Sequence, residues 1–388
     1  MTSPGAIADG ILAMVSPASE QPGRRRRPRV PSADRLIWFA VMALMALGTI
    51  MVLSSSVMLA DRKYGTPGFF WSRQLLWWSL ATFSLMVFSR LNHRRFRDWA
   101  PLILLLGVAG LLLVLALPPV KGVHRWVVLG PLRWQPAEGF RLAFIVYAAA
   151  FLAKRGEEII WARRWLLLIA VMVAGSALLM LQPEFSAVLT LWATAGILLV
   201  AAGVRWRHVL PAVGVGVVAA LIVVYGFGYK KSRVDDWQAG LTTTEGSYQV
   251  KQSKIALGSG GVLGQGLGQG RAKMSYLPEP HTDFILSSIG EELGFIGVTF
   301  VWAAFGLLVY RSWRAAMRAP DRFGYLLCIG IGGSLLVNAV LNAAVATGLS
   351  PATGLPLPFV SYGGSSLLCT AVGWGMVLNV SRFQVARG

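Results

Sequence analysis

The sequence contains few of the residues that disulfides and most metal sites need. Only two cysteines and four histidines occur among 388 residues. Cys328 and Cys369 each lie inside an apolar stretch, where we expect small buried side chains and neither a disulfide nor a zinc framework. The pattern His-Glu-x-x-His is absent, and no serine stands three residues before a lysine, which excludes the serine-acylating motif of transpeptidases. No tightly bound transition metal is therefore expected.

Acidic residues are also scarce. The chain has 17 Asp and Glu against 36 Lys and Arg, a formal net charge of +19. The cations stand in short clusters that follow every second apolar run, which is the positive-inside pattern of membrane proteins and not that of a nucleic-acid-binding protein. The pattern predicts that both termini are cytoplasmic. The clusters lie at 24–35, 90–97, 154–164, 205–207, 311–322 and 382–387.

Long apolar runs are abundant in the sequence. Hydrophobic residues make up 55% of the chain, and the mean hydropathy is +0.60. Because roughly 20 apolar residues cross a bilayer, the sequence predicts an all-α polytopic membrane protein with about ten transmembrane helices. The expected spans are 36–60, 69–89, 101–117, 138–153, 165–181, 186–204, 209–228, 284–310, 323–347 and 364–381.

The chain is expected to have one membrane domain, preceded by a tail. Residues 1–34 are rich in Pro, Ser and Arg and predict a disordered basic cytoplasmic tail, and 35–388 predict a single transmembrane domain. The first apolar run starts too late and is too long for a signal peptide, so we expect a retained helix. A long extracytoplasmic loop is expected at about 229–283, with a short interfacial helix at 248–257.

Ionisable residues close to the spans are costly and are therefore candidates for function. Glu138 and Arg141 begin the fourth span on one helical face, where the alternative role is a local ion pair. Glu184 lies in the next outer turn. Asp283 begins the eighth span, where the alternative role is a helix cap.

A glycine-rich segment at 258–270 reads GSGGVLGQGLGQG. Its backbone N–H groups could face a phosphate, but it matches neither the Walker pattern nor the dinucleotide fingerprint, so tight turns are an equal alternative. Glu291 and Glu292, further along the chain, are expected to serve packing.

Three long segments resemble the SEDS family of polytopic cell-wall polymerases, which includes FtsW, RodA and SpoVE. They are SYQVKQSKIALGSGGVLGQGLGQG (247–270), YLPEPHTDFILSSIGEELGFIG (276–297) and NAAVATGLSPATGLPLPFVSYGGSS (342–366). Weaker matches are RWVVLGPLRWQPAE (125–138) and LQPEF (181–185). Within the family, the HTDFILSSIGEELG, YLPE and GLPLPF segments are most similar to FtsW.

The resemblance implies a peptidoglycan glycosyltransferase that polymerises lipid II, an undecaprenyl-pyrophosphate-linked substrate, on the outer face of the bacterial inner membrane. It implies a class B penicillin-binding protein as transpeptidase partner, together with other division proteins, and a location at the division septum. The alternatives are a lipid II flippase, an elongation-type RodA-like polymerase and a recruiting scaffold. The outer position of the candidate residues favours the enzyme, because a flippase path also needs polar partners at mid-membrane.

The resemblance also implies roles for individual residues. The family's essential Asp falls on Asp283, the expected catalytic base. Arg141 replaces the family's usual Lys and keeps the charge, with a planar fork suited to phosphate. Ala137 replaces a usual Ser, and Glu184 replaces a usual Asp, which argues against a role that requires a short carboxylate. No cofactor is expected to bind tightly, but Mg²⁺ or Mn²⁺ is considered, with Asp283 and Glu138 as candidate ligands. The residues expected to bind substrate are Glu138, Arg141, Arg125, His281, Lys254, Ser361 and Tyr362.

Overall fold

The computed structural model describes residues 34–120, 122–130, 132–155, 166–204, 214, 235, 237–238, 248–271, 277 and 280–383. Within these ranges, helices occupy every predicted span except the seventh, at 209–228, which lies outside the described residues. The predicted tail and most of the predicted long loop lie outside them as well.

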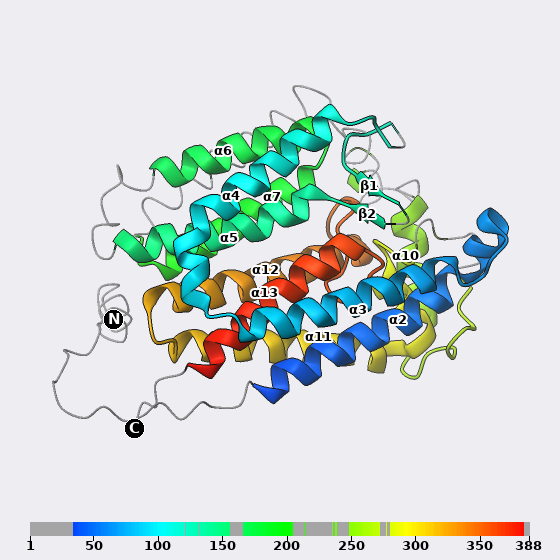
Figure 1. Ribbon diagram of the computed structural model, residues 1–388. Coiled ribbons are helices and arrows are strands. Elements are labelled where there is room, and N and C mark those ends of the chain that lie inside the picture. The colour runs from blue at the N-terminus through cyan, green and yellow to red at the C-terminus, as the bar shows by residue number, and fades with distance from the viewer. Residues whose placement is uncertain are drawn as a thin grey trace.

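The helices run back and forth and lie side by side (Figure 1). The lengths and the apolar composition of these helices agree with a membrane-spanning bundle. Five helices, α2, α4, α5, α11 and α12, are long and apolar enough to cross a membrane, and α6 and α7 are shorter apolar helices. The predicted all-α polytopic membrane fold is confirmed. The helices are α2 (Arg35–Tyr64), α3 (Phe69–Arg90), α4 (His93–Ala116), α5 (Pro136–Arg155), α6 (Leu166–Leu181), α7 (Phe185–Ala201), α11 (Ile285–Met317), α12 (Arg322–Thr347) and α13 (Gly364–Arg382).

Capping residues mark several of the helix ends. The side chains of Asp34, Asn92 and Asp321 accept hydrogen bonds from backbone N–H groups at the starts of α2, α4 and α12. Gly65 and Gly348 end α2 and α12 in the left-handed conformation, which glycine adopts without strain. These signals set where the apolar runs stop and the connections begin.

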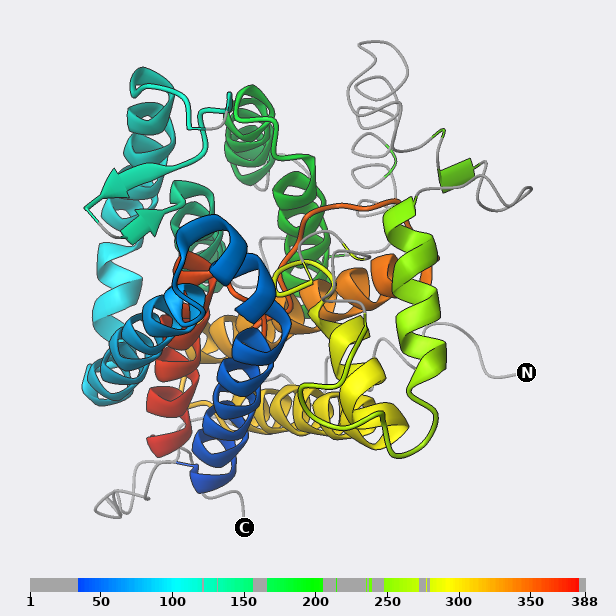
Figure 2. The ribbon, with the colours of Figure 1, turned by 90° about the vertical axis from the view of Figure 1, so that its right-hand side faces the viewer.

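The bundle has two chemically different ends. At one end, on the left of Figure 1, α3, α5, α11 and α13 finish and α4 and α12 begin. We call it the basic end, because described cations of the predicted clusters lie there: Arg35, Arg90, Arg94, Arg95, Arg97, Lys154, Arg311, Arg314, Arg318, Arg322 and Arg382. The opposite end, which faces the viewer in Figure 2, is called the loop end.

Two small elements lie at the loop end. An antiparallel hairpin of β1 (Val127–Leu129) and β2 (Leu132–Trp134) precedes α5. The all-α prediction missed this hairpin. The short helix α10 (Tyr248–Ser259) confirms the helix expected at 248–257.

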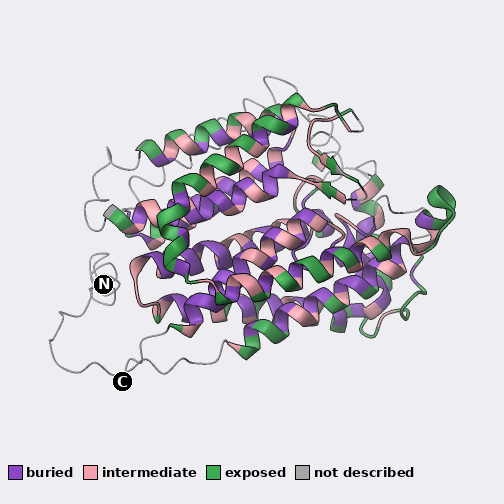
Figure 3. Cartoon of the chain, viewed as in Figure 1, coloured by how far each residue is buried: buried purple, intermediate pink, exposed green. Residues whose placement is uncertain are grey.

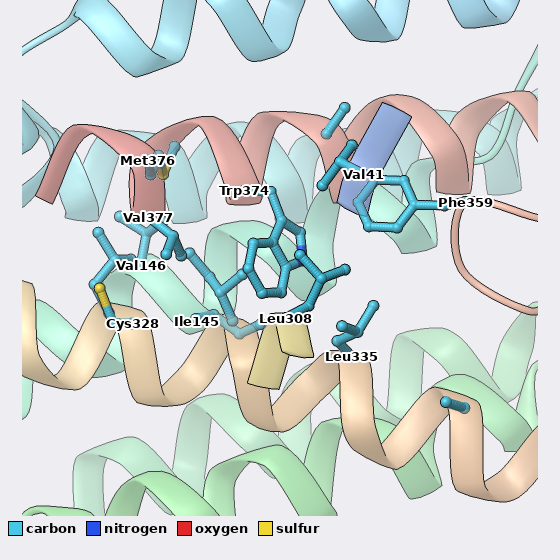
Figure 4. Close-up of a cluster of buried hydrophobic side chains, with 14 of the residues drawn as sticks. Val41, Ile145, Val146, Leu308, Cys328, Leu335, Phe359, Trp374, Met376 and Val377 are labelled. Carbon is cyan, nitrogen blue, oxygen red and sulfur yellow. The ribbon is translucent and has the colours of Figure 1, made fainter. Parts of the chain in front are cut away.

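The core lies where α2, α5, α11, α12 and α13 meet. Trp374 is fully buried, and side chains such as Ile145, Leu335 and Phe359 lie around its indole (Figure 4). Buried residues concentrate on the facing sides of these helices (Figure 3). The two cysteines are free and buried, as predicted.

The glycine-rich segment forms a loop that packs on a kink in α11, and Figure 2 shows it running between α10 and the start of α11. The kink is at Gly294, which has φ 66° and ψ −162°. The N–H of Gly268 donates to the Glu292 carboxylate over 3.0 Å, and that of Arg271 donates to Glu291 over 2.7 Å. Because these N–H groups already bind carboxylates, the structure favours tight turns over a phosphate-binding loop.

Candidate functional site

A cavity of about 350 Å³ lies at the loop end, and we call it the main cavity. It forms where the start of α5, the α6–α7 turn, the start of α11 and the segment before α13 meet. A larger cavity of about 1100 Å³ lies at the basic end and contains none of the predicted site residues. The main cavity is lined by several of them: Arg125, Glu138, Arg141, Glu184, Asp283 and Tyr362.

The first turn of α5 supplies an ion pair to this cavity. Arg141 Nη1 donates to Glu138 Oε1 over 3.0 Å, and both side chains are buried. Glu138 also stands in the first helical turn, where the helix dipole favours a negative charge. The predicted ion pair is therefore present, and it faces the cavity instead of lying apart from it.

The α6–α7 turn supplies Glu184. Its carboxylate accepts a hydrogen bond from the Gln135 side chain and lies 3.8 Å from Arg125 Nε. Arg125 also donates to the backbone carbonyls of Gln182 and Pro183, so it holds the turn as well as the carboxylate. Burial raises the pKa of Glu184 to about 7, with Arg125 lowering it and Glu138 raising it further.

Asp283 lies in the turn just before α11. The N-cap of α11 is Phe284, the residue that follows Asp283, and the alternative role of Asp283 as a helix cap stays a prediction. The side-chain amide of Asn342 donates to the Asp283 carbonyl over 2.9 Å and to the Leu355 carbonyl over 2.8 Å. The Asp283 backbone is therefore tied to α12 and to the segment that precedes α13.

The rest of this turn is held by the segment before α13. The Tyr362 N–H donates to the His281 carbonyl over 2.9 Å. The Ser361 hydroxyl donates to the Thr282 carbonyl and accepts from the Leu357 N–H. Residues 281–283 are thus fixed from both sides, which orients the Asp283 carboxylate toward the cavity that it lines.

A second cavity of about 240 Å³ lies beside the main one and is formed by the ends of α2 and α3 and by the hairpin. His281 is buried in its wall, with its ring centroid 4.6 Å from that of Phe70 and 5.6 Å from that of Tyr362. Tyr362 lines both cavities. Burial raises the pKa of its hydroxyl.

The structure thus brings most predicted residues to the two cavities, with two exceptions. Ser361 is buried in the turn and acts on the backbone. Lys254 lies on α10 against Gly348 and lines neither cavity. The substrate-binding roles stay predictions.

Sequence reasoning missed several residues of the site. Gln135, Ser186 and Thr353 line the main cavity, and Ser186 donates to the Thr353 carbonyl. Gln135 and Thr353 fall inside segments that carry the family resemblance, which was the available signal. In the part of the chain that the structure describes, no three His, Cys, Asp or Glu side chains converge as a metal site.

A model of the FtsW/RodA/SpoVE family, described as cell cycle proteins, matches residues 34–386. The chain belongs to this family. A probable peptidoglycan glycosyltransferase FtsW of Trichlorobacter lovleyi is 41% identical over 367 residues, which cover 92% of this chain and 95% of that protein. The predicted SEDS resemblance is confirmed.

Two solved structures of family members have the same fold. The rod shape determining protein RodA of Thermus thermophilus aligns with a TM-score of 0.69 at 29% identity, covering 92% of this chain and 99% of RodA. A chain of a peptidoglycan synthase complex, described as coordinating polymerization and crosslinking, aligns with a TM-score of 0.72 at 27% identity. That alignment covers 90% of this chain and 98% of the other.

Proposed function

We propose that this protein is a peptidoglycan glycosyltransferase that polymerises lipid II into glycan strands on the outer face of the inner membrane during cell division. The observation that carries the proposal is Asp283, which is fixed by its backbone and lines a cavity at the end opposite the basic clusters. The family, and the activity in the names of the relatives, support the same function.

The charge distribution supports the orientation. Cationic clusters favour the cytoplasmic side, so the basic end faces the cytoplasm and the main cavity faces outward. Both chain termini are then cytoplasmic. Lipid II presented at the outer leaflet would meet the cavity at head-group level.

In the proposed reaction, Asp283 is the general base. It removes the proton from a sugar hydroxyl of the acceptor, and the hydroxyl oxygen attacks the anomeric carbon of the donor. A new carbon–oxygen bond forms while the bond from that carbon to the diphosphate oxygen breaks. The electron pair leaves with the lipid diphosphate, and the proton stays on Asp283 until solvent removes it.

The other groups of the main cavity would orient substrate and balance charge. Arg141 is held by Glu138, so its position is defined before substrate binds. A divalent cation such as Mg²⁺ or Mn²⁺ would be held by Asp283 and Glu138, the two candidate ligands, which both line the main cavity. When bound, it would neutralise charge on the diphosphate.

A class B penicillin-binding protein and other division proteins are the proposed partners, and the division septum is the proposed location. The similarity to a chain of a peptidoglycan synthase complex supports a crosslinking partner. The named FtsW relatives favour the division role over an elongation role.

A flippase is less well supported. Below the main cavity, Asn338 and Trp374 provide polar groups at mid-membrane depth, next to the Glu138–Arg141 pair. The space between them is only about 40 Å³. It holds roughly one or two water molecules and cannot pass a disaccharide head group.

The test is polymer formation from labelled lipid II by the purified protein, alone and with its transpeptidase partner. Asp283→Asn keeps the shape and removes the base, so we expect polymer to form about 100- to 10,000-fold more slowly. Asp61→Asn is the control, because Asp61 is an exposed carboxylate at the same end that lines neither cavity.

Near-normal polymer from Asp283→Asn would contradict the assignment. Movement of lipid II between leaflets without polymer would support a flippase. A scaffold predicts that cell division proceeds normally with Asp283→Asn.

A further inference from the structure

The large cavity at the basic end, which we call the basic cavity, is lined by residues of α4, α5, α6 and the start of α12. Its volume of about 1100 Å³ exceeds the roughly 300–1,000 Å³ of pockets that enclose a drug-sized ligand. From Glu138 in the main cavity to Lys154 in the basic cavity, α5 rises about 24 Å. A group bound in the basic cavity is therefore too far from the main cavity to take part in its chemistry.

Three cations lie along the basic cavity at the end of the bundle. Arg97 comes from the first two turns of α4, Lys154 from the last turn of α5 and Arg322 from the first residue of α12. Arg97 and Lys154 are exposed, whereas Arg322 is half-buried and donates to the Ala202 carbonyl over 2.9 Å. The three side chains thus approach one space from three different helices.

Two carboxylates also line the basic cavity, and both have cationic partners. Asp98 lies 3.3 Å from Arg97 Nε. Asp321 lies 3.3 Å from Arg94 Nε, and Arg94 is not among the lining residues, so the charge of Asp321 is compensated from outside the cavity. Lys154 and Arg322 add further positive charge, and an anion is therefore favoured.

The deeper wall of the basic cavity is apolar. Tyr147, Phe151 and Lys154 follow one another at spacings of four and three residues, so they share one face of α5. The Tyr147 and Phe151 ring centroids are 5.8 Å apart, and Tyr147 lies about 10 Å deeper along the helix than Lys154. Pro101 of α4 and Leu167 of α6 extend this apolar wall. The cavity therefore changes from charged to apolar with depth, as a phospholipid does.

The basic cavity borders a surface suited to contact with lipid. Leu167 lines the cavity and is exposed, and Leu102, which follows Pro101 on α4, is exposed as well. Trp99 is exposed on α4 close to Arg97, and tryptophan is enriched where membrane and water meet. A lipid can therefore reach the cavity from the bilayer.

We propose that the basic cavity binds an anionic phospholipid, which belongs to the inner leaflet when the basic end faces the cytoplasm. Its phosphate lies among Arg97, Lys154 and Arg322, where the arginine forks suit phosphate oxygens. The first part of its acyl chains lies against Tyr147 and Phe151. Basic pockets between transmembrane helices on the cytoplasmic side are suited to such head groups. The predicted cytoplasmic tail is a poorer occupant, because its arginines have the same charge as the cavity.

The bound lipid would also support the main cavity from a distance. Residues of α4, α5 and α6 line the basic cavity, so a lipid that fills it contacts all three helices. The opposite end of α6 leads into the turn that carries Glu184. The lipid site itself does not depend on the proposed reaction at Asp283.

The test measures the affinity of phosphatidylglycerol for the purified full-length protein in detergent, by native mass spectrometry at increasing lipid concentration. We expect Arg97→Gln and Lys154→Gln each to weaken binding about fivefold, because each removes a cation from beside the anionic head group. Both side chains are exposed, so their replacement leaves the fold intact. Lys154→Arg keeps the charge and should retain the affinity.

The apolar wall is tested separately. Ala150 lines the basic cavity on α5, and Ala150→Phe adds a ring there without changing any charge. We expect this variant to weaken binding of phosphatidylglycerol as well, because the ring occupies the space of the acyl chains. Unchanged affinity in Ala150→Phe would overturn the placement of the chains against α5.

The controls separate this site from general charge effects. Arg95→Gln removes an exposed cation of the same helix that does not line the basic cavity, and it should leave the affinity unchanged. Asp283→Asn should also bind phosphatidylglycerol normally. Equal losses in Arg95→Gln and Arg97→Gln would overturn the proposal, as would unchanged affinity in both Arg97→Gln and Lys154→Gln.

Two competing ligands test the chemistry of the occupant. Phosphatidylethanolamine has no net charge and should bind more weakly than phosphatidylglycerol. Equal affinities for the two lipids would overturn the selection of an anionic head group. Inorganic phosphate lacks acyl chains and should not displace the lipid at equal concentration. Displacement by phosphate would overturn the lipid and make the basic cavity a site for free phosphate.

Discussion

Glu184 has almost no contact with solvent, and its folded environment disfavours ionisation. Burial raises the pKa of this carboxyl from 4.5 to about 7. Below pH 4.5 the group is protonated in both the folded and the unfolded chain. Between pH 4.5 and 7 the folded chain retains a proton that the unfolded chain has lost, so stability falls as the pH rises through this window.

Glu184→Gln removes this titration while its side-chain oxygen can still accept the bond from Gln135. We expect the variant to gain stability relative to the unchanged protein as the pH rises from 5 to 8, by roughly 2–3 kcal/mol. The measurement is the thermal unfolding midpoint of both proteins in detergent at each pH. A difference between the two midpoints that is the same at pH 5 and pH 8 would contradict the raised pKa.

At the scale of elements, apolar run length was enough to predict the described helices, because each span must cross the same thickness of hydrocarbon. The hairpin at 127–134 was missed because strands of three residues are too short to show a period of two. The kink of α11 was missed as well, since Gly294 lies in a run whose composition resembles a continuous helix.

In the candidate site, too, some residues could be predicted from the sequence and others could not. The family resemblance identified Asp283, Glu138 and Arg141, and the structure places all three around one cavity. The tie from Asn342 to the Asp283 carbonyl joins residues 59 positions apart, and no local pattern shows such a contact. Arg73 lies in a helix start without a motif, so only the folded chain shows its position beside Tyr362.

The kink of α11 can be tested with one substitution, and the same helix provides a control. A Cβ at Gly294 would lie 2.3 Å from the backbone nitrogen of Gly264, and the positive φ adds strain of roughly 1–3 kcal/mol. Gly294→Ala should therefore lower the thermal unfolding midpoint. Gly306→Ala meets nothing within 4 Å and should leave the midpoint unchanged or raise it, because alanine favours the helix. Equal midpoints for the two variants would show that the loop yields to the added methyl group.

At the scale of the whole molecule, the proposed chemistry depends on one asymmetry. The described arginine clusters lie at the basic end, whereas Asp283, the main cavity and the second cavity lie at the loop end. If the bundle were inserted the other way, the cavities would face the cytoplasm. Glycan strands could then be extended only at the inner leaflet.

Cysteine labelling tests this orientation directly. Cys328 and Cys369 are buried, so the background reaction should be low. Lys251→Cys places an exposed thiol on α10 at the loop end, and Arg95→Cys places one at the basic end. In intact spheroplasts, a membrane-impermeant maleimide should label Lys251→Cys and spare Arg95→Cys, whereas detergent should expose both, because only the loop end meets the outside. Labelling of Arg95→Cys alone before permeabilisation would reverse the orientation and remove the outward-facing site.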